Sequence, residues 1–230
     1  MEQQTLDRIG RYFPLKEREA SDLNTFRVNG MEFRTRAYTA EGFGNVAVME
    51  ASGMLGLMRM TTLVLNPFCI NAPLFSYDRI QAMGKDKLYL EVFDTMLENE
   101  EADPAGEGEG KAFDPSGMEA VRKRYEALPS FDAGSHWYDG MYVGTPVFKG
   151  GQKKDAADFD ACFEAYLDAY LAAVHDMPAC DEEKKREKAA VYSEGLLVRG
   201  GPATDPVKAA IGEEKTAAFF RNVLFGTDAR

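Results

Sequence analysis

The sequence predicts a single α/β domain of 230 residues, in which an antiparallel sheet is covered by helices on both faces. Two observations predict this class. Five or six alternating apolar runs follow one another from residue 24 to residue 97 with no helix between them, which is typical of a meander rather than of βαβ units. Helical periodicity then dominates from residue 118 onward, and these helices would cover the sheet.

The N-terminal segment predicts a helix followed by a hairpin. Apolar residues stand at helical spacing among charges near the start of the chain: Leu6, Ile9, Tyr12 and Phe13. Pro14 weakens the pattern beyond that point. The run FRVNGMEFRTRAY then places Asn29-Gly30 between two alternating segments, which is a strong signal for a two-residue hairpin turn.

Four further strand candidates cover residues 43–51, 57–65, 73–84 and 88–97. The next segment, 98–117, is acidic and rich in glycine and proline, so it cannot bury enough apolar surface to order itself. It resembles a linker between domains. We interpret it instead as a loop inserted into one domain of residues 1–230, because the preceding strands still need cover on their apolar faces.

The expected helices cover residues 118–127, 155–175 and 181–194, with a final helix from about residue 205 to residue 224. The second of these carries apolar residues at intervals of three to four, which indicates a face packed in the core. Its members are Phe159, Cys162, Phe163, Tyr166, Leu167, Tyr170, Leu171 and Val174.

Composition and motifs exclude several classes of protein. A net charge of −11 argues against nucleic acid as the main partner, because binding a polyanion needs clustered lysine and arginine. Three cysteines without paired spacing make a disulfide framework or a structural metal site unlikely on pattern grounds. No signal peptide or stretch of ~20 apolar residues is found, so we expect a cytoplasmic protein without a membrane span. His136 and His175 have no nucleophile nearby and are expected at the surface and at a helix end.

Asp78 is the most informative single residue. On the strand PLFSYDRI it shares a face with Leu74 and Ile80, while Phe75 and Tyr77 point the other way. Aspartate is depleted in strands and costly to bury without a partner. It is therefore either an edge residue in water or a buried acid with a raised pKa, and the pattern leaves both open. Glu50, at the end of VAVME, poses the same question.

Two further segments are informative: TTLVLNPFCINAPLFSYDRIQAMGKDKLYLEVFDTM (61–96) and DPVKAAIGEEKTAAFFRNVLFG (205–226). The first is similar to the active-site strands of the ferredoxin-dependent bilin reductases, and the second resembles their closing helix. The superfamily of these reductases includes red chlorophyll catabolite reductase. A loop that contains Trp137 before an FKGG strand also agrees. The clear similarity covers about a quarter of the chain, and red chlorophyll catabolite reductase is equally compatible with it.

The resemblance implies a three-layer α/β/α sandwich with a linear tetrapyrrole between the sheet and the C-terminal helices. Such proteins hold no bound flavin or metal. Ferredoxin, or flavodoxin in its place, donates electrons one at a time, and the protein supplies protons to a bilin radical. A general acid must be protonated at working pH, and an apolar sheet face raises a carboxyl pKa in that way.

The resemblance also assigns roles to individual residues. Asp78 matches the proton donor, Asp205 an aspartate before the last helix that faces the bilin, and Glu50 falls near a glutamate used for vinyl reduction. The positions expected to contact substrate are Thr61, Thr62, Phe75, Lys149 and Lys208, with the two lysines on the propionates. Phycocyanobilin-forming members carry a histidine at the position of Thr61 or Thr62, so the regiochemistry does not follow.

Three interpretations therefore remain open. The first is a bilin reductase, with a cluster of Arg79, Lys85 and Lys87 that either docks acidic ferredoxin or is only a charged turn. The second is a carrier that binds haem or a bilin without reducing it, which the missing histidine favours. The third is an α/β protein unrelated to tetrapyrroles, with Asp78 on a wet edge strand.

Overall fold

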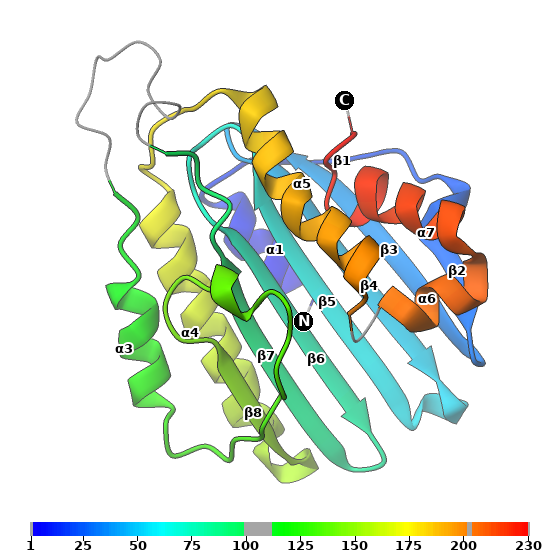
Figure 1. The fold of residues 1–230 in the computed structure, drawn as a ribbon. Coiled ribbons are helices and arrows are strands. Elements are labelled where there is room, and N and C mark those ends of the chain that lie inside the picture. The colour runs from blue at the N-terminus through cyan, green and yellow to red at the C-terminus, as the bar shows by residue number, and fades with distance from the viewer. Residues whose placement is uncertain (1, 99–111, 202–203, 230) are drawn as a thin grey trace.

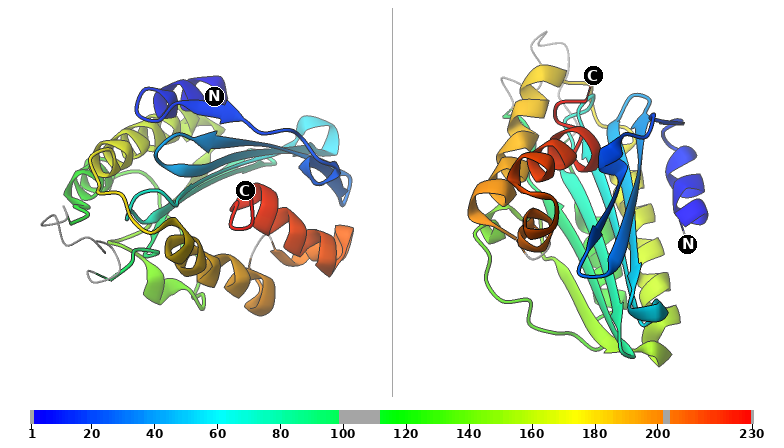
Figure 2. Two further views of the ribbon diagram at one scale, coloured as in Figure 1. Left: turned by 90° about the horizontal axis from the view of Figure 1, so that it is seen from above. Right: turned by 90° about the vertical axis from the view of Figure 1, so that its right-hand side faces the viewer.

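The structure, a computed structural model, describes residues 2–98, 112–201 and 204–229. It is a three-layer arrangement in which one large antiparallel sheet lies between two layers of helices (Figures 1 and 2). The predicted fold class is thus confirmed. Most of the expected acidic loop falls on residues 99–111, which lie outside the described residues.

The sheet contains eight strands within the described residues, and their order is β1-β3-β4-β5-β6-β7-β8, with β2 paired to β3. Every pairing is antiparallel, so consecutive strands from β2 to β7 form the predicted meander, and β8 pairs with β7 from more than fifty residues further along the chain. The strands are β1 (Leu15–Glu17), β2 (Thr25–Val28), β3 (Met31–Ala40), β4 (Gly44–Gly53), β5 (Met58–Pro67), β6 (Leu74–Ala82), β7 (Lys85–Phe93) and β8 (Val147–Gln152).

Tight turns set the register of the sheet. Asn29 and Gly30 both adopt positive φ angles, 48° and 80°, between β2 and β3, as the Asn-Gly pair predicts. Met83 and Gly84 do the same between β6 and β7, at 49° and 78°. Such turns match the twist of the flanking strands, and they fix which residues share a face because side chains alternate along each strand.

The helices cover the sheet from both sides. They are α1 (Glu2–Gly10), α3 (Ser116–Arg124), α4 (Ala156–Val174), α5 (Glu182–Arg199), α6 (Thr204–Ile211) and α7 (Glu213–Phe219), followed by a π-helical turn (Phe220–Leu224). Figure 2 shows α1, α3 and α4 on one side of the sheet and α5, α6 and α7 on the other. We call these sides the α4 face and the α5 face.

Each face has its own apolar core. On the α4 face the predicted stripe of α4 is buried in full, and the rings of Tyr77 and Phe163 stack with centroids 3.9 Å apart. The strands contribute alternate residues to this core: Val46, Val48, Leu63, Leu65, Phe75, Leu88 and Leu90. Their neighbours in sequence point to the α5 face instead: Ala47, Met49, Val64, Leu74 and Phe93.

The structure differs from the predicted elements at several places. Strand β7 runs from Lys85 to Phe93 where 88–97 was predicted, and α5 continues to Arg199 where the prediction ended at residue 194. The expected final helix is broken at Gly212, whose φ of 83° ends α6 and begins α7. Only glycine adopts this conformation without steric cost, so the break is encoded locally. Strand β1, which pairs Leu15 with Ala40, was not predicted because three residues are too few for a pattern.

Candidate functional site

Asp78 lies in the middle of the sheet and not at its edge. Its strand, β6, is hydrogen bonded to β5 on one side and to β7 on the other. Alternation places Asp78 on the α5 face together with Leu74, as the strand pattern predicts. The side chain is half-buried. The edge-strand interpretation is therefore wrong, and Asp78 is an acid held on a central strand.

Thr62 is the direct partner of Asp78. The two residues pair across β5 and β6, and the hydroxyl of Thr62 donates a hydrogen bond to Oδ1 of Asp78. Desolvation is the larger influence on this carboxyl and raises its pKa to about 6, while the bond from Thr62 acts in the opposite direction. Asp78 therefore exchanges its proton near neutral pH.

A second carboxylate, Glu91, lies on the same face, and sequence reasoning missed it. Across β6 and β7, Asp78 pairs with Tyr89, and Ser76 pairs with Glu91. Glu91 is thus the diagonal neighbour of Asp78, a spacing of roughly 7–8 Å. Its side chain is buried, and the hydroxyl of Tyr142 donates a 2.6 Å hydrogen bond to Oε1. The sequence signal for Glu91 was a charged residue on the same strand face as two aromatic residues, Tyr89 and Phe93.

Aromatic rings enclose the two carboxylates on the α5 face. The ring of Tyr192, on α5, stacks on Phe93 with centroids 4.1 Å apart, and Tyr138 meets both rings at 5.7 Å. His136 lies parallel to Tyr138 at 4.9 Å. The charges of Asp78 and Glu91 help to raise the pKa of Tyr138 and Tyr192, after desolvation as the main cause. These rings form an apolar wall beside the acids.

Trp137, the single tryptophan of the chain, attaches its loop to α5. The same loop carries Tyr138, one of the rings of the wall. Its indole Nε1 donates a 3.1 Å hydrogen bond to the carbonyl of Gly200. The ring lies against Gly195, where a Cβ atom would come within 2.1 Å of Cη2 of Trp137. The guanidinium of Arg199 covers the ring at 5.1 Å from its centroid. Gly195 thus provides the space that the indole occupies.

Beyond the helices, the α5 face continues as a floor of half-buried side chains. In Figure 1 the lower parts of β5, β6 and β7 carry no helix on the side of α5. Alternation places the following half-buried residues on this floor: Met58, Met60, Ile80, Tyr89 and Phe148. Lys87 is exposed next to it, with its ammonium 4.4 Å from the ring centroid of Phe131. The five side chains of the floor are mainly apolar, and Tyr89 is the direct cross-strand partner of Asp78.

Three predicted site residues point away from Asp78. Glu50, Thr61 and Phe75 all lie on the α4 face. Phe75 belongs to the core on that face, and Glu50 and Thr61 each stand two residues along a strand from a member of it. Glu50 is exposed, and Phe75 is fully buried against Tyr170 at 5.1 Å between centroids. The structure does not bring these residues together with Asp78, since the sheet lies between them.

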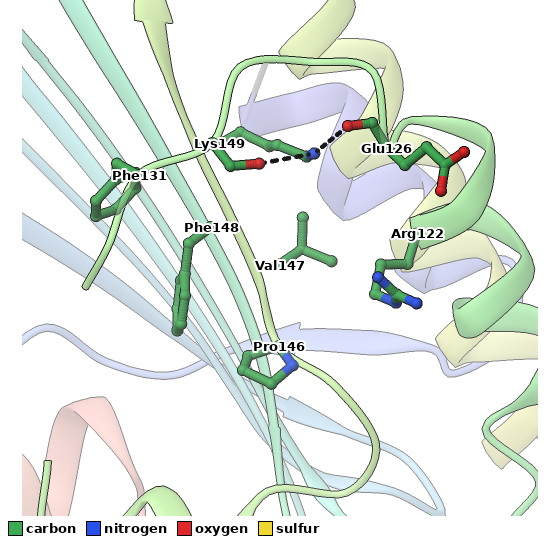
Figure 3. Close-up of a pocket in the computed structure, with 8 residues that line it drawn as sticks. Arg122, Glu126, Phe131, Pro146, Val147, Phe148 and Lys149 are labelled. Atoms are coloured by element: carbon green, nitrogen blue, oxygen red, sulfur yellow. Dashed lines mark hydrogen bonds between the residues drawn. The ribbon is translucent and has the colours of Figure 1, made fainter. Parts of the chain in front are cut away.

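Lys149 also lies on the α4 face. Its ammonium is buried, and it donates hydrogen bonds to the carbonyls of Glu126 and Leu128 and to the hydroxyl of Ser130. It borders a pocket of about 280 Å³ between β8 and α3, where Arg122 also points inward (Figure 3). Lys149 therefore holds the 126–130 loop on the strand, and the structure does not bring it to the side of Asp78.

Asp205 and Lys208 are on the same side of the sheet as Asp78, in α6. Asp205 is exposed, with its carboxylate near the Cα of Gly200, where a Cβ would lie 3.1 Å from Oδ1. The ammonium of Lys208 donates a hydrogen bond to the carbonyl of Leu197. Both residues therefore lie at the junction of α5 and α6.

Arg79 is not part of a basic surface cluster. Its guanidinium is buried on the α4 face and bonds Asp86 through Nε at 2.5 Å and Asp160 through Nη1 at 2.9 Å. Lys85 and Lys87 are exposed, as expected. Arg79 thus ties the sheet to α4 and does not contribute to a docking surface.

The remaining sequence predictions concern histidines, metals and membranes. His175 caps the C-terminus of α4 and packs against the ring of Tyr12 at 5.3 Å. Among the described residues there is no group of three or more histidine, cysteine or acidic side chains able to hold a metal ion. Within the same residues, no helix has the length and apolar character needed to cross a membrane.

Comparison with known proteins gives a structural relative. No protein-family model matches the sequence, and no curated protein matches it significantly. The structure is similar to that of phytochromobilin synthase from tomato in complex with biliverdin, with a TM-score of 0.77. The likeness covers 98% of this chain and 82% of that chain, at 11% sequence identity. At this identity the likeness shows the fold, and the chain has the fold of phytochromobilin synthase.

Proposed function

We propose that this protein reduces a linear tetrapyrrole of the biliverdin type in the cytoplasm, with Asp78 as the main proton donor. The observation that carries the proposal is the placement of Asp78, a carboxyl with a pKa of about 6 beside an apolar sheet surface. An acid of this strength is protonated in part of the molecules at neutral pH, as a general acid requires. The fold shared with a biliverdin-binding protein supports the choice of substrate.

The chemistry needs electrons and protons in equal number. Reduction of one bilin double bond takes two electrons and two protons. Ferredoxin or flavodoxin would supply the electrons one at a time, with no flavin or metal bound to this chain. Asp78 would give one proton to the bilin, which leaves an aspartate that the hydroxyl of Thr62 stabilises.

The surroundings of Asp78 suit a bilin, which is a large conjugated plane with two carboxylates. The floor of Met60, Ile80 and Tyr89 offers a mainly apolar surface for the rings. Exposed Lys87 stands at the border of this surface, where it could pair with a propionate. We therefore replace Lys149 by Lys87 as the proposed propionate partner and keep Lys208 as a second candidate.

A tetrapyrrole carrier is the alternative, and one observation favours it. Thr62 stands directly opposite Asp78. It is one of the two positions, Thr61 or Thr62, at which the resemblance puts the histidine of some reductases. Loss of that group would remove one acid from the site. Binding without reduction is the behaviour that this alternative predicts.

The test is an absorbance titration of the protein with biliverdin, followed by anaerobic addition of reduced ferredoxin. A saturable, red-shifted complex whose spectrum changes on reduction is the result that the proposal predicts. A complex that forms and does not react would support the carrier. If no complex forms, the protein shares only its fold with bilin-binding proteins.

A further inference from the structure

Glu91 is a buried carboxylate for which the proposed chemistry has no role so far. Its side chain is 8% exposed, and the hydroxyl of Tyr142 donates a hydrogen bond to its Oε1 at 2.6 Å. A carboxylate placed in a core without a cation is costly unless it holds a proton. Its position on the same face as Asp78, one residue pair away, makes it part of the same site.

The titratable groups that face Glu91 within the described chain are acidic or phenolic. They come from β6, from β7, from the loop before β8 and from α5: Asp78, Tyr89, Tyr138, Asp139, Tyr142 and Tyr192. Burial is the main cause that raises the pKa of Glu91 to about 7, and the charges of Asp78 and Asp139 add to it. The hydrogen bond from Tyr142 acts the other way.

We infer that Glu91 is the second acid of the site and delivers its proton to the substrate through the hydroxyl of Tyr142. This role rests on the proposed function. In the step, the phenol of Tyr142 gives its proton to a substrate atom that has received an electron from the reductant. For this step the carboxyl of Glu91 holds its proton and donates it across the same 2.6 Å contact to the phenol oxygen, while the hydroxyl proton of Tyr142 turns toward the substrate. The carboxyl then gives its proton to the phenol oxygen as the phenol gives its own to the substrate. The products are a protonated substrate atom, a neutral Tyr142 and a Glu91 carboxylate.

The half-buried position of Tyr142 is what makes it the connecting group. Glu91 lies below the surface, whereas the ring of Tyr142 is part of the aromatic wall and contacts Phe93 at 5.3 Å. Burial and the charge of Glu91 place the pKa of Tyr142 far above its ordinary value, so the phenol keeps its proton at neutral pH. The relay therefore moves both protons together and does not pass through a free phenolate. Because Asp78 and Glu91 repel each other as anions, the pair keeps one proton near neutral pH after the other has left.

The first test needs no substrate. In protein labelled with ¹³C-glutamate, the infrared band of a protonated carboxyl should titrate near pH 7 and should be absent in Glu91→Gln. In Asp78→Asn this band should titrate at lower pH, because a repelling charge is gone. The matched control is Glu187→Gln, an exposed glutamate on α5, which should leave the band unchanged. A band that is the same in Glu91→Gln and wild type would contradict the assignment.

The second test measures turnover of biliverdin with reduced ferredoxin. Glu91→Gln and Tyr142→Phe should each slow product formation about 10²-fold, the contribution typical of a general acid, with biliverdin affinity kept within about threefold. Wild-type rates in both variants would overturn the relay and leave the proposed function intact. Failure of the wild type itself to reduce biliverdin would overturn both. Tyr142→Phe keeps the test decisive if Glu91→Gln folds poorly.

Discussion

Thr62 and Asp78 are direct partners across the central strands β5 and β6, and the hydroxyl of Thr62 donates a hydrogen bond to the carboxyl of Asp78. A donor of this kind stabilises the ionised form of an acid, while the surrounding protein favours the neutral form. The acid strength of Asp78 is the balance between the two, with desolvation the larger. The polar partner therefore keeps Asp78 from becoming too weak an acid to act near neutral pH.

Replacing Thr62 by valine should raise the pKa of Asp78 above about 6, because the group that stabilises the charged form is lost. A hydrogen bond to a charged group contributes ~1.5 kcal/mol, so the rise should be about one unit. A general acid works when protonated, and bilin reduction should therefore persist to higher pH in Thr62→Val. The pH profile of turnover measures this. Thr61→Val, on the α4 face, is the control. A pH profile that is unchanged or moves to lower pH would show that Thr62 does not stabilise the charged form of Asp78.

The contact between Gly195 and Trp137 predicts a second result. A methyl group on Gly195 would lie 2.1 Å from Cη2 of the indole, so Gly195→Ala should push Trp137 out of its place on α5. Fluorescence of this single tryptophan should then shift to longer wavelength, and its quenching by biliverdin should weaken. The cost in unfolding free energy should be about 1–3 kcal/mol, as for other overpacked sites.

The matched control for this prediction is Gly140→Ala, which has open space around its Cβ position in the same loop. It should leave the emission spectrum of Trp137 unchanged. An unchanged spectrum in Gly195→Ala would mean that the indole does not pack on α5.

The buried ion pair of Arg79 and Asp86 predicts a stability effect without an effect on the site. Arg79→Met leaves Asp86 buried without a cation, with the amide of Gln81 still donating to it, which should lower the free energy of unfolding by ~3–5 kcal/mol. The double variant with Asp86→Leu should regain most of that loss. Denaturant unfolding of the single and double variants measures both. Biliverdin affinity of the folded double variant should equal that of the wild type, because the pair lies on the α4 face. A large loss of affinity would show that Arg79 serves the ligand.

The strand pattern predicted correctly which residues of β6 share a face of the sheet. Alternation along β6 places Leu74 and Asp78 on one face and Phe75 and Tyr77 on the other, and the two cores confirm this. The same rule, applied to the neighbouring strands, would have moved Glu50 to the far face. Its role came from the family resemblance, and an alignment shifted by one residue moves a side chain through the sheet.

Other parts of the site depend on pairing between strands, which one sequence does not reveal. Glu91 becomes the neighbour of Asp78 only through the register of β6 and β7. Tyr142 reaches Glu91 from a loop 51 residues further along the chain. The sequence also could not decide whether β6 is an edge strand or a central strand, because strand order is a tertiary property. Local signals such as Asn29-Gly30 were predictable since the turn needs only two residues.

The most direct test of the account is single-turnover reduction of biliverdin by Asp78→Asn under anaerobic conditions with reduced ferredoxin. Asparagine keeps the size of the side chain and removes its acidic proton. We predict that the variant binds biliverdin with an affinity within about threefold of the wild type and reduces it ~10²–10⁴-fold more slowly. Asp158→Asn, an exposed aspartate on α4, should react like the wild type. Wild-type rates in Asp78→Asn would contradict the assignment of Asp78 as the main proton donor.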